Sequence, residues 1–213
     1  MGQGKFIVLE GLDGAGTTTQ LEKLAGKVRA LGMPVLTTRE PSDGPLGLLL
    51  RQALSGRLSL PAGRGPLSAE TLALMFAADR MDHLHAKVRP ALDGGTVVIC
   101  DRYVLSSLAY QGATVPMEWV NELNREALAP DLTLFIEVDA ETAATRRQLR
   151  GAPAELFEED GLQRRIAAQY RRAIRLRGGS EKIVRVSGAE GIEAVTEACW
   201  AHVEALLHKR AKR

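Results

Sequence analysis

The chain has 213 residues, 45% of them hydrophobic and 25% charged, with a formal net charge of +2. This composition is ordinary for a soluble globular protein, and the length suits one α/β domain better than two. The basic residues outnumber the acidic ones only by 28 to 26, without the clustered excess of a nucleic-acid binder, so no nucleic-acid partner is expected. No apolar run approaches the ~18 residues of a membrane span, and the first residues form no signal segment. We therefore expect a cytoplasmic protein without a membrane partner.

Short apolar runs alternate with amphipathic segments along the chain. The runs are mostly apolar and are bounded by Gly, Pro or Asp, which predicts buried parallel strands over residues 5–9, 34–37, 96–100, 132–138 and 182–186. The intervening segments repeat apolar residues every three or four positions, which predicts helices over 18–31, 69–92, 118–128, 142–150, 162–176 and 192–207. Two irregular stretches, 55–66 and 151–161, are expected to be loops.

This alternation predicts an α/β fold. Right-handed crossovers between successive strands produce an open parallel sheet that helices cover on both faces. We therefore predict a three-layer α/β/α architecture with a five-stranded parallel sheet, in a single domain over residues 1–213. Ligands of such sheets bind at the carboxyl ends of the strands, and the motifs considered next follow predicted strands.

The segment after the first predicted strand has the spacing GxxxxGK[ST] of a phosphate-binding loop, with one departure: Thr17 stands at the lysine position. Its glycines let backbone amides converge on phosphate oxygens at the start of a helix. We expect a P-loop NTPase fold, with the Thr18 hydroxyl placed to hold Mg²⁺; a glycine-rich turn without a ligand is the alternative. The predicted ATP-binding loop comprises Gly11, Leu12, Asp13, Gly14, Ala15, Gly16, Thr17 and Thr18.

The missing lysine bears on the rate of any phosphoryl transfer. That lysine normally offsets charge on the β- and γ-phosphates, and removal of one preorganised donor lowers a rate by about 10²- to 10³-fold. Thr17 is neutral and too short to replace it. Either another cation takes its place, or the protein is slow, or it binds nucleotide without turnover.

Four further motifs follow in order. They are Arg39-Glu40-Pro41, then residues 74–80 (LMFAADR), 101–112 (DRYVLSSLAYQG) and 129–133 (APDLT). Together with the phosphate loop, they resemble the thymidylate kinase family over residues 5 to about 190. The resemblance implies phosphoryl transfer from ATP to thymidine monophosphate (dTMP), with Mg²⁺ as cofactor, and it implies a homodimer. The apolar helices predicted over 69–92 and 118–128 could supply the dimer surface or pack on the sheet.

The resemblance assigns residues to the nucleoside of dTMP. Asp13 would accept a hydrogen bond from the sugar 3′-hydroxyl, although a carboxylate at a helix start is the alternative. Phe76 would stack on thymine, whereas taken alone it is typical of a core residue. Arg80 would donate to the base, because a guanidinium on an apolar helix face needs a partner. Either Ser107 or Gln111 would touch the base, and Tyr110 would pack on the deoxyribose where a 2′-hydroxyl would clash.

The acceptor phosphate and the metal have candidate residues of their own. The resemblance implies that Arg39, Arg51 and Arg102 clamp the phosphate, a role that suits a rigid fork of donors. Arg51 is equally compatible with a plain surface charge. Asp101 ends an apolar strand, where a carboxylate would reach Mg²⁺ together with Thr18. A salt bridge with Arg102 or a helix cap is the alternative for Asp101.

The lid, about residues 146–162, departs from the family pattern because residues 154–158 contain no arginine. Arg146 and Arg150 lie four apart on one predicted helix face and are our candidates to neutralise ATP; a solvated arginine face is the alternative. The predicted catalytic set is thus Asp13, Arg102, Arg146 and Arg150. Residues 186–189, after the last predicted strand, would flank the adenine.

Two functions from different classes compete at this level. The first is an enzyme that transfers phosphate from ATP to dTMP, and the second is a nucleotide-binding protein that lost turnover. The acceptor residues favour the enzyme, and the missing lysine favours the binder. A kinase for another nucleotide acceptor is a third possibility, which Phe76, Arg80 and Tyr110 argue against. Thr17→Lys is expected to raise the rate unless another cation already fills that role.

Overall fold

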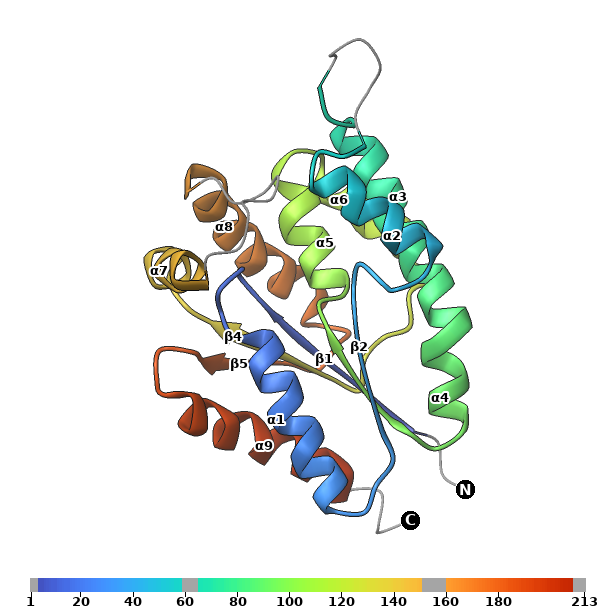
Figure 1. Cartoon of the computed structure of the whole chain (residues 1–213), viewed down its shortest axis with the longest axis vertical. Coiled ribbons are helices and arrows are strands. Elements are labelled where there is room, and N and C mark those ends of the chain that lie inside the picture. Colours follow the sequence, from blue (N-terminus) through green and yellow to red (C-terminus); the bar gives the residue numbers. More distant parts are fainter. Residues whose placement is uncertain (1–3, 59–64, 151–159, 209–213) are drawn as a thin grey trace.

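A computed structural model describes residues 4–58, 65–150 and 160–208 (Figure 1). Its five strands form one parallel sheet in the order β2-β3-β1-β4-β5. The strands are β1 (Lys5–Gly11), β2 (Val35–Arg39), β3 (Val97–Asp101), β4 (Leu132–Glu137) and β5 (Ile183–Ser187). The predicted five-stranded parallel sheet is confirmed, and each strand overlaps its predicted range.

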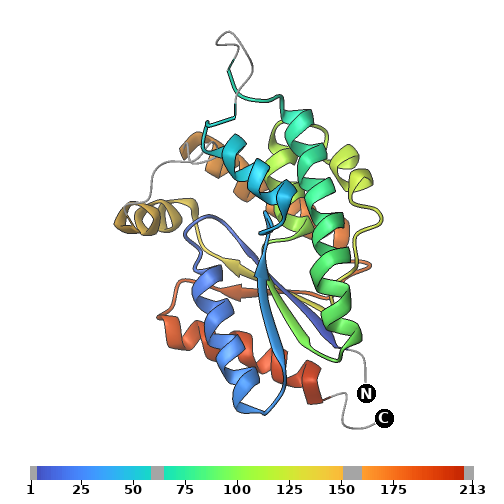
Figure 2. The same cartoon turned by 45° about the vertical axis from the view of Figure 1, so that its right-hand side comes forward.

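Helices cover both faces of the sheet, as Figures 1 and 2 show. They are α1 (Thr17–Ala30), α2 (Pro45–Leu54), α3 (Ala69–His83), α4 (Arg89–Asp93), α5 (Val104–Tyr110), α6 (Met117–Leu123), α7 (Ala140–Arg150), α8 (Asp160–Arg177) and α9 (Ile192–His208). The three-layer α/β/α prediction is confirmed. Within the described ranges, no helix is long and apolar enough to cross a bilayer.

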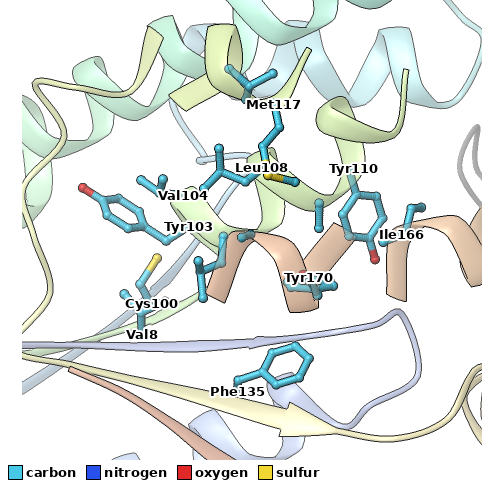
Figure 3. Packing of buried hydrophobic residues seen from close by; sticks show 14 of the residues in the cluster. Val8, Cys100, Tyr103, Val104, Leu108, Tyr110, Met117, Phe135, Ile166 and Tyr170 are labelled. Atoms are coloured by element: carbon cyan, nitrogen blue, oxygen red, sulfur yellow. The ribbon is translucent and has the colours of Figure 1, made fainter. Parts of the chain in front are cut away.

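Alternation along β1 separates two of the core clusters. Phe6 and Val8 face the cluster that packs under α4, α5, α6 and α8, whereas Ile7 and Leu9 face the cluster under α1 and α9. Successive side chains of a strand point to opposite faces, so a continuous apolar run is what a strand covered on both sides requires. Figure 3 shows the first cluster, in which helix residues lie over the sheet.

The predicted helix over 69–92 is interrupted. α3 ends at His83, a π-helical turn (η2, Leu84–Val88) follows, and α4 begins at Arg89. Pro90 lies in the first turn of α4 and has no N–H for the regular ladder, and its ring crowds the carbonyl four residues earlier. The widened turn before Pro90 is a way to relieve this conflict.

The predicted helix over 118–128 is too long, since α6 ends at Leu123. The side-chain amide of Asn124 donates to the Val120 carbonyl at 2.8 Å, an acceptor that a continuing helix would use. α2 was not predicted. It begins at Pro45, a residue favoured in the first turn of a helix, and its buried face contains Gly47, Leu50, Ala53 and Leu54.

Candidate active site

The phosphate loop connects β1 to α1 at the carboxyl edge of the sheet. Gly14 and Gly16 have φ angles of 96° and 94°, a left-handed region that favours glycine. A Cβ atom on Gly14 would also come within 2.4 Å of the Ala143 carbonyl oxygen of α7. Gly14 is therefore needed for two reasons, its backbone conformation and the lack of space for a Cβ atom. The loop places the amino-terminal end of α1 at the cavity that the loop borders.

A hydroxyl and a carboxylate meet beside this loop. Leu9 of β1 pairs with Asp101 of β3, so the ends of adjacent parallel strands lie together. The Thr18 hydroxyl donates to Asp101 Oδ2 at 2.5 Å. Asp101 Oδ1 is buried without a hydrogen-bond partner among the described residues. A buried carboxylate oxygen normally has a partner, and hard oxygen donors of this kind suit Mg²⁺.

Two cavities adjoin the loop, and they are named for the nucleotide that the sequence predicts in each. The donor-side cavity runs from the loop to the segment after β5; it is lined by Asp13, Gly14, Ala15, Gly16, Thr17, Thr18, Thr19, Gln20, Asp101, Arg102, Arg146, Gly188, Glu190, Gly191, Ile192 and Val195. The acceptor-side cavity lies between α3 and α5; it is lined by Asp13, Glu40, Pro41, Leu54, Phe76, Arg80, Arg102, Tyr103, Ser106, Ser107, Tyr110 and Gln111. Asp13 and Arg102 line both cavities, so the two spaces meet at this pair.

Asp13 and Arg102 are held together by several contacts. Arg102 Nη2 lies 2.5 Å from Asp13 Oδ1, and the Tyr110 hydroxyl donates to Asp13 Oδ2 at 2.8 Å. The Arg102 guanidinium also lies over the Tyr110 ring. Arg102 has a φ of 68°, an uncommon backbone conformation for a residue with a side chain. Such outliers persist where the surroundings enforce them, which motivates a functional role for Arg102.

The far end of the acceptor-side cavity is built around Arg80. Its guanidinium is fully buried, donates to Glu40 at 2.9 Å and to Ser107 at 3.0 Å, and also contacts Asn124. Arg80 therefore has the hydrogen-bond partners that the sequence led us to expect, and these partners are protein groups. A contact between Arg80 and the base stays a prediction. Phe76 lines the cavity. Gln111 Oε1 is buried and, within the described residues, has no partner, so it is available to a ligand donor.

The three arginines of the predicted phosphate clamp do not converge in this structure. Arg102 lines the acceptor-side cavity, whereas Arg39 and Arg51 are absent from its lining. Arg39 is exposed and pairs with Asp43 at 3.1 Å. Arg51 donates to the Pro41 carbonyl at 2.8 Å and lies 3.6 Å from Asp43. These arginines hold the pKa of the Asp43 carboxyl below its usual value, the hydrogen bond from Arg39 being the main cause.

The donor-side candidates are only partly brought together. Arg146 lines the cavity and donates to the Gly188 carbonyl at 3.0 Å, so both lie where the adenine was expected. Of the predicted stretch 186–189, Gly188 lines this cavity. The Arg150 side chain and the lid residues 151–159 lie outside the described residues.

A buried carboxylate is bound to Tyr103 and Ser106, two residues that line the acceptor-side cavity. Glu10 accepts hydrogen bonds from the amides of Tyr103 and Ser106 at 2.9 and 3.1 Å, from the Ser106 hydroxyl at 2.5 Å and from the Tyr170 hydroxyl at 3.2 Å. Burial raises the pKa of Glu10, and the Ser106 hydrogen bonds and the Arg102 charge lower it in part. The Tyr170 hydroxyl also donates to the Gly11 carbonyl at 2.9 Å. This network connects α8 to the phosphate loop.

Sequence reasoning did not identify several of these residues. Glu10 is a single acid inside an apolar strand, a signal that could have marked it as a buried charge that needs partners. Tyr170 offers no such signal, because it lies on an amphipathic helix 160 positions away from Glu10. Ile192 and Val195 line the donor-side cavity, but in the sequence they look like ordinary apolar positions of a helix.

Comparison with known proteins agrees with this geometry. The family model described as Thymidylate kinase matches residues 9–199. The chain is 40% identical over 215 residues to the thymidylate kinase of Thermomicrobium roseum, with 98% of each chain covered. It is 35% identical over 201 residues to the thymidylate kinase of Nostoc punctiforme, with 91% of this chain and 92% of that protein covered. A match over most of the chain, joined to a phosphate loop between two cavities, shows that this chain belongs to the thymidylate kinase family.

Proposed function

We propose that the protein is a thymidylate kinase, which transfers the terminal phosphoryl group of ATP to dTMP and gives ADP and dTDP. The observation that carries this proposal is the position of Asp13 and Arg102, which line both cavities. Two nucleotides that occupy these cavities would have their phosphates beside the same pair of residues. Their approach in a fixed orientation supplies much of the acceleration in phosphoryl transfer.

The residues of each cavity have roles in this reaction. Backbone amides of residues 14–18 bind the donor phosphates, and Gly188 borders the adenine. Arg102 neutralises charge where the acceptor phosphate attacks, and no protein nucleophile is needed. Thr18 and Asp101 would hold Mg²⁺, and the bound ion would neutralise charge on the phosphates. Asp13 and Tyr110 position the sugar, while Phe76, Ser107 and Gln111 border the base.

The remaining clamp and lid residues are part of the proposal as well. Arg51 donates to the carbonyl of Pro41, which lines the acceptor-side cavity, and Arg39 is exposed to solvent; a phosphate would compete with Asp43 for both arginines. Arg150 follows Arg146 by one helical turn on α7. We propose that Arg39, Arg51, Arg146 and Arg150, all in a single domain, bind the anionic phosphates of the nucleotides.

We propose that the protein acts as a homodimer in the cytoplasm. α2 exposes Leu48 and Leu49, and α3, which packs on α2, exposes Leu74 and Met81. An apolar patch on paired helices is a surface that a second copy can cover. ATP and dTMP are nucleotides of the cell interior, which supports the cytoplasmic location.

The test is an assay of the purified protein with ATP, Mg²⁺ and a panel of nucleoside monophosphates. We expect dTDP from dTMP above a control without protein, and dTMP to give the highest kcat/KM of the panel. Turnover with another acceptor but none with dTMP would contradict the substrate. Binding of ATP and dTMP without product would support the nucleotide-binding alternative instead.

A further inference from the structure

The phosphate loop lacks the positive charge that its sequence pattern normally carries, because Thr17 replaces the lysine. Two arginines line the described part of the donor-side cavity, and both donate to protein groups. Arg102 is bound to Asp13 and to the Gly11 carbonyl, where the two cavities meet. Arg146 donates to the Gly188 carbonyl, at the end of the cavity away from the loop. Within the described residues, neither arginine donates to residues 14–18 of the loop.

A third arginine contacts the loop from α7. Arg147 is half-buried, and its Nη1 donates to the backbone carbonyl of Asp13 at 2.8 Å. Its position is fixed by the packing of α7, because the Ala143 carbonyl one turn earlier lies against Gly14. Residues four apart share one helix face, so Ala143 and Arg147 approach consecutive loop residues from the same side. The guanidinium is thereby held beside the loop whose amides face the phosphates.

We propose that Arg147 is a positioning residue that replaces the missing lysine electrostatically. It fixes the Asp13 carbonyl and places a permanent positive charge next to the phosphate loop. A charge outside the cavity lining still acts on an anion through the protein, because the effective dielectric constant there is far below that of water. This inference rests on the proposed kinase activity and names the residue that compensates for Thr17.

The decisive experiment is a double-mutant cycle between positions 147 and 17, with dTDP formation as the readout. Arg147→Gln keeps a donor for the Asp13 carbonyl but removes the charge, and we expect it to lower kcat by about 10²-fold. In the Thr17→Lys background an ammonium returns to the loop. There Arg147→Gln should lower kcat by about threefold or less, because the ammonium already supplies the positive charge that the Arg147 guanidinium contributes. Thr17→Lys alone should change the rate of the native protein little.

Two further variants separate charge from structure. Arg147→Lys keeps the charge and should stay within about tenfold of the native kcat, well above Arg147→Gln. Arg175→Gln is the matched control on α8, where Arg175 is exposed, and it should leave kcat unchanged. The affinity of Arg147→Gln should fall more for ATP than for AMP, because the charge acts on the outer phosphates. Thermal unfolding of each variant shows that it is folded.

The outcomes are distinct. An equal loss from Arg147→Gln in both backgrounds, or an Arg147→Gln variant as active as Arg175→Gln, would overturn the inference. If Thr17→Lys does not fold, equal kcat values for Arg147→Lys and Arg147→Gln would overturn it instead. If the native protein forms no dTDP although it binds both nucleotides, the proposed function fails, and the ATP and AMP affinities of Arg147→Gln still decide whether the charge acts on the outer phosphates.

Discussion

The hydroxyl of Tyr110 donates a 2.8 Å hydrogen bond to the carboxylate of Asp13, at the place where the two cavities meet. Burial raises the pKa of this tyrosine, so the hydroxyl stays protonated and donates at neutral pH. The Arg102 guanidinium lies over the same ring. Tyr110 thus orients the two residues that line both cavities, and its ring borders the space in which the acceptor sugar is expected.

Tyr110→Phe and Tyr110→Ala separate the hydroxyl from the ring. Loss of a hydrogen bond to a charged group costs about 1.5–3 kcal/mol, so we expect Tyr110→Phe to lower kcat/KM for dTMP by at least about tenfold. Its preference for dTMP over ribothymidine monophosphate should persist, because the ring remains. Tyr110→Ala should lose that preference. The measurement is kcat/KM for both acceptors, and an unchanged preference in Tyr110→Ala would exclude the ring as the discriminating group.

The proposed metal site allows a second matched pair of variants. Thr18→Ser keeps the hydroxyl beside Asp101, whereas Thr18→Val keeps the shape and removes it. We expect Thr18→Ser to resemble the native protein, and Thr18→Val and Asp101→Asn to need at least about tenfold more Mg²⁺ for half-maximal activity. Activity measured against Mg²⁺ concentration at saturating ATP tests this. Identical Mg²⁺ dependence in Thr18→Val and Thr18→Ser would remove Thr18 from the metal site.

The proximity of Thr18 and Asp101 could be predicted from the sequence for a simple physical reason. The phosphate loop is local, and parallel strands present their carboxyl ends at one edge of the sheet, so Thr18 and Asp101 were expected together. The sheet was predictable for a related reason, since β-branched apolar runs such as residues 96–100 have few other places to be buried. These features depend on short stretches of chain or on the geometry of the sheet as a whole.

Other features depend on contacts between distant side chains and could not be predicted. The direction of Arg39 and Arg51 is set by Asp43, which competes with any ligand for the same guanidinium groups. The early end of α6 follows from a side-chain bond of Asn124, and that residue also contacts Arg80. Periodicity reports which face of a helix is apolar, but it does not report which polar group a buried side chain will meet.

The loop between β2 and α2 is anchored by a buried aspartate. Asp79 of α3 accepts from the Ser42 amide at 2.8 Å and from the Ser42 hydroxyl at 2.6 Å. Asp79→Ala would leave two buried donors unpaired, so we expect the free energy of unfolding to fall by about 2–4 kcal/mol. The KM for dTMP should rise, because Pro41 of this loop lines the acceptor-side cavity.

The control for this prediction is Asp82→Ala, three residues later on α3, where the side chain is exposed and the expected change is within about 0.5 kcal/mol. Urea unfolding and dTMP saturation curves of both variants are the measurements. Equal stabilities of Asp79→Ala and Asp82→Ala would show that Asp79 does not anchor the loop.

The buried carboxylate of Glu10 should make stability depend on pH. Burial raises the pKa of Glu10 in the folded protein above the ordinary value of 4.5, so between these two values the folded state binds the proton that the unfolded state has released. Its contribution is therefore fully present below the ordinary pKa and is lost as the pH rises through the raised pKa. A single proton gives a slope of at most about 1.4 kcal/mol per pH unit.

Glu10→Gln removes this titration but keeps a carbonyl oxygen for the amides of Tyr103 and Ser106. We expect the unfolding free energy of the native protein, relative to Glu10→Gln, to decrease as the pH rises from about 4.5 toward neutrality. Urea unfolding of both proteins at a series of pH values is the measurement. A difference that stays constant would mean that the hydrogen bonds from Ser106 and Tyr103 balance the effect of burial on this carboxyl group, and a difference that grows with pH would mean that they outweigh it.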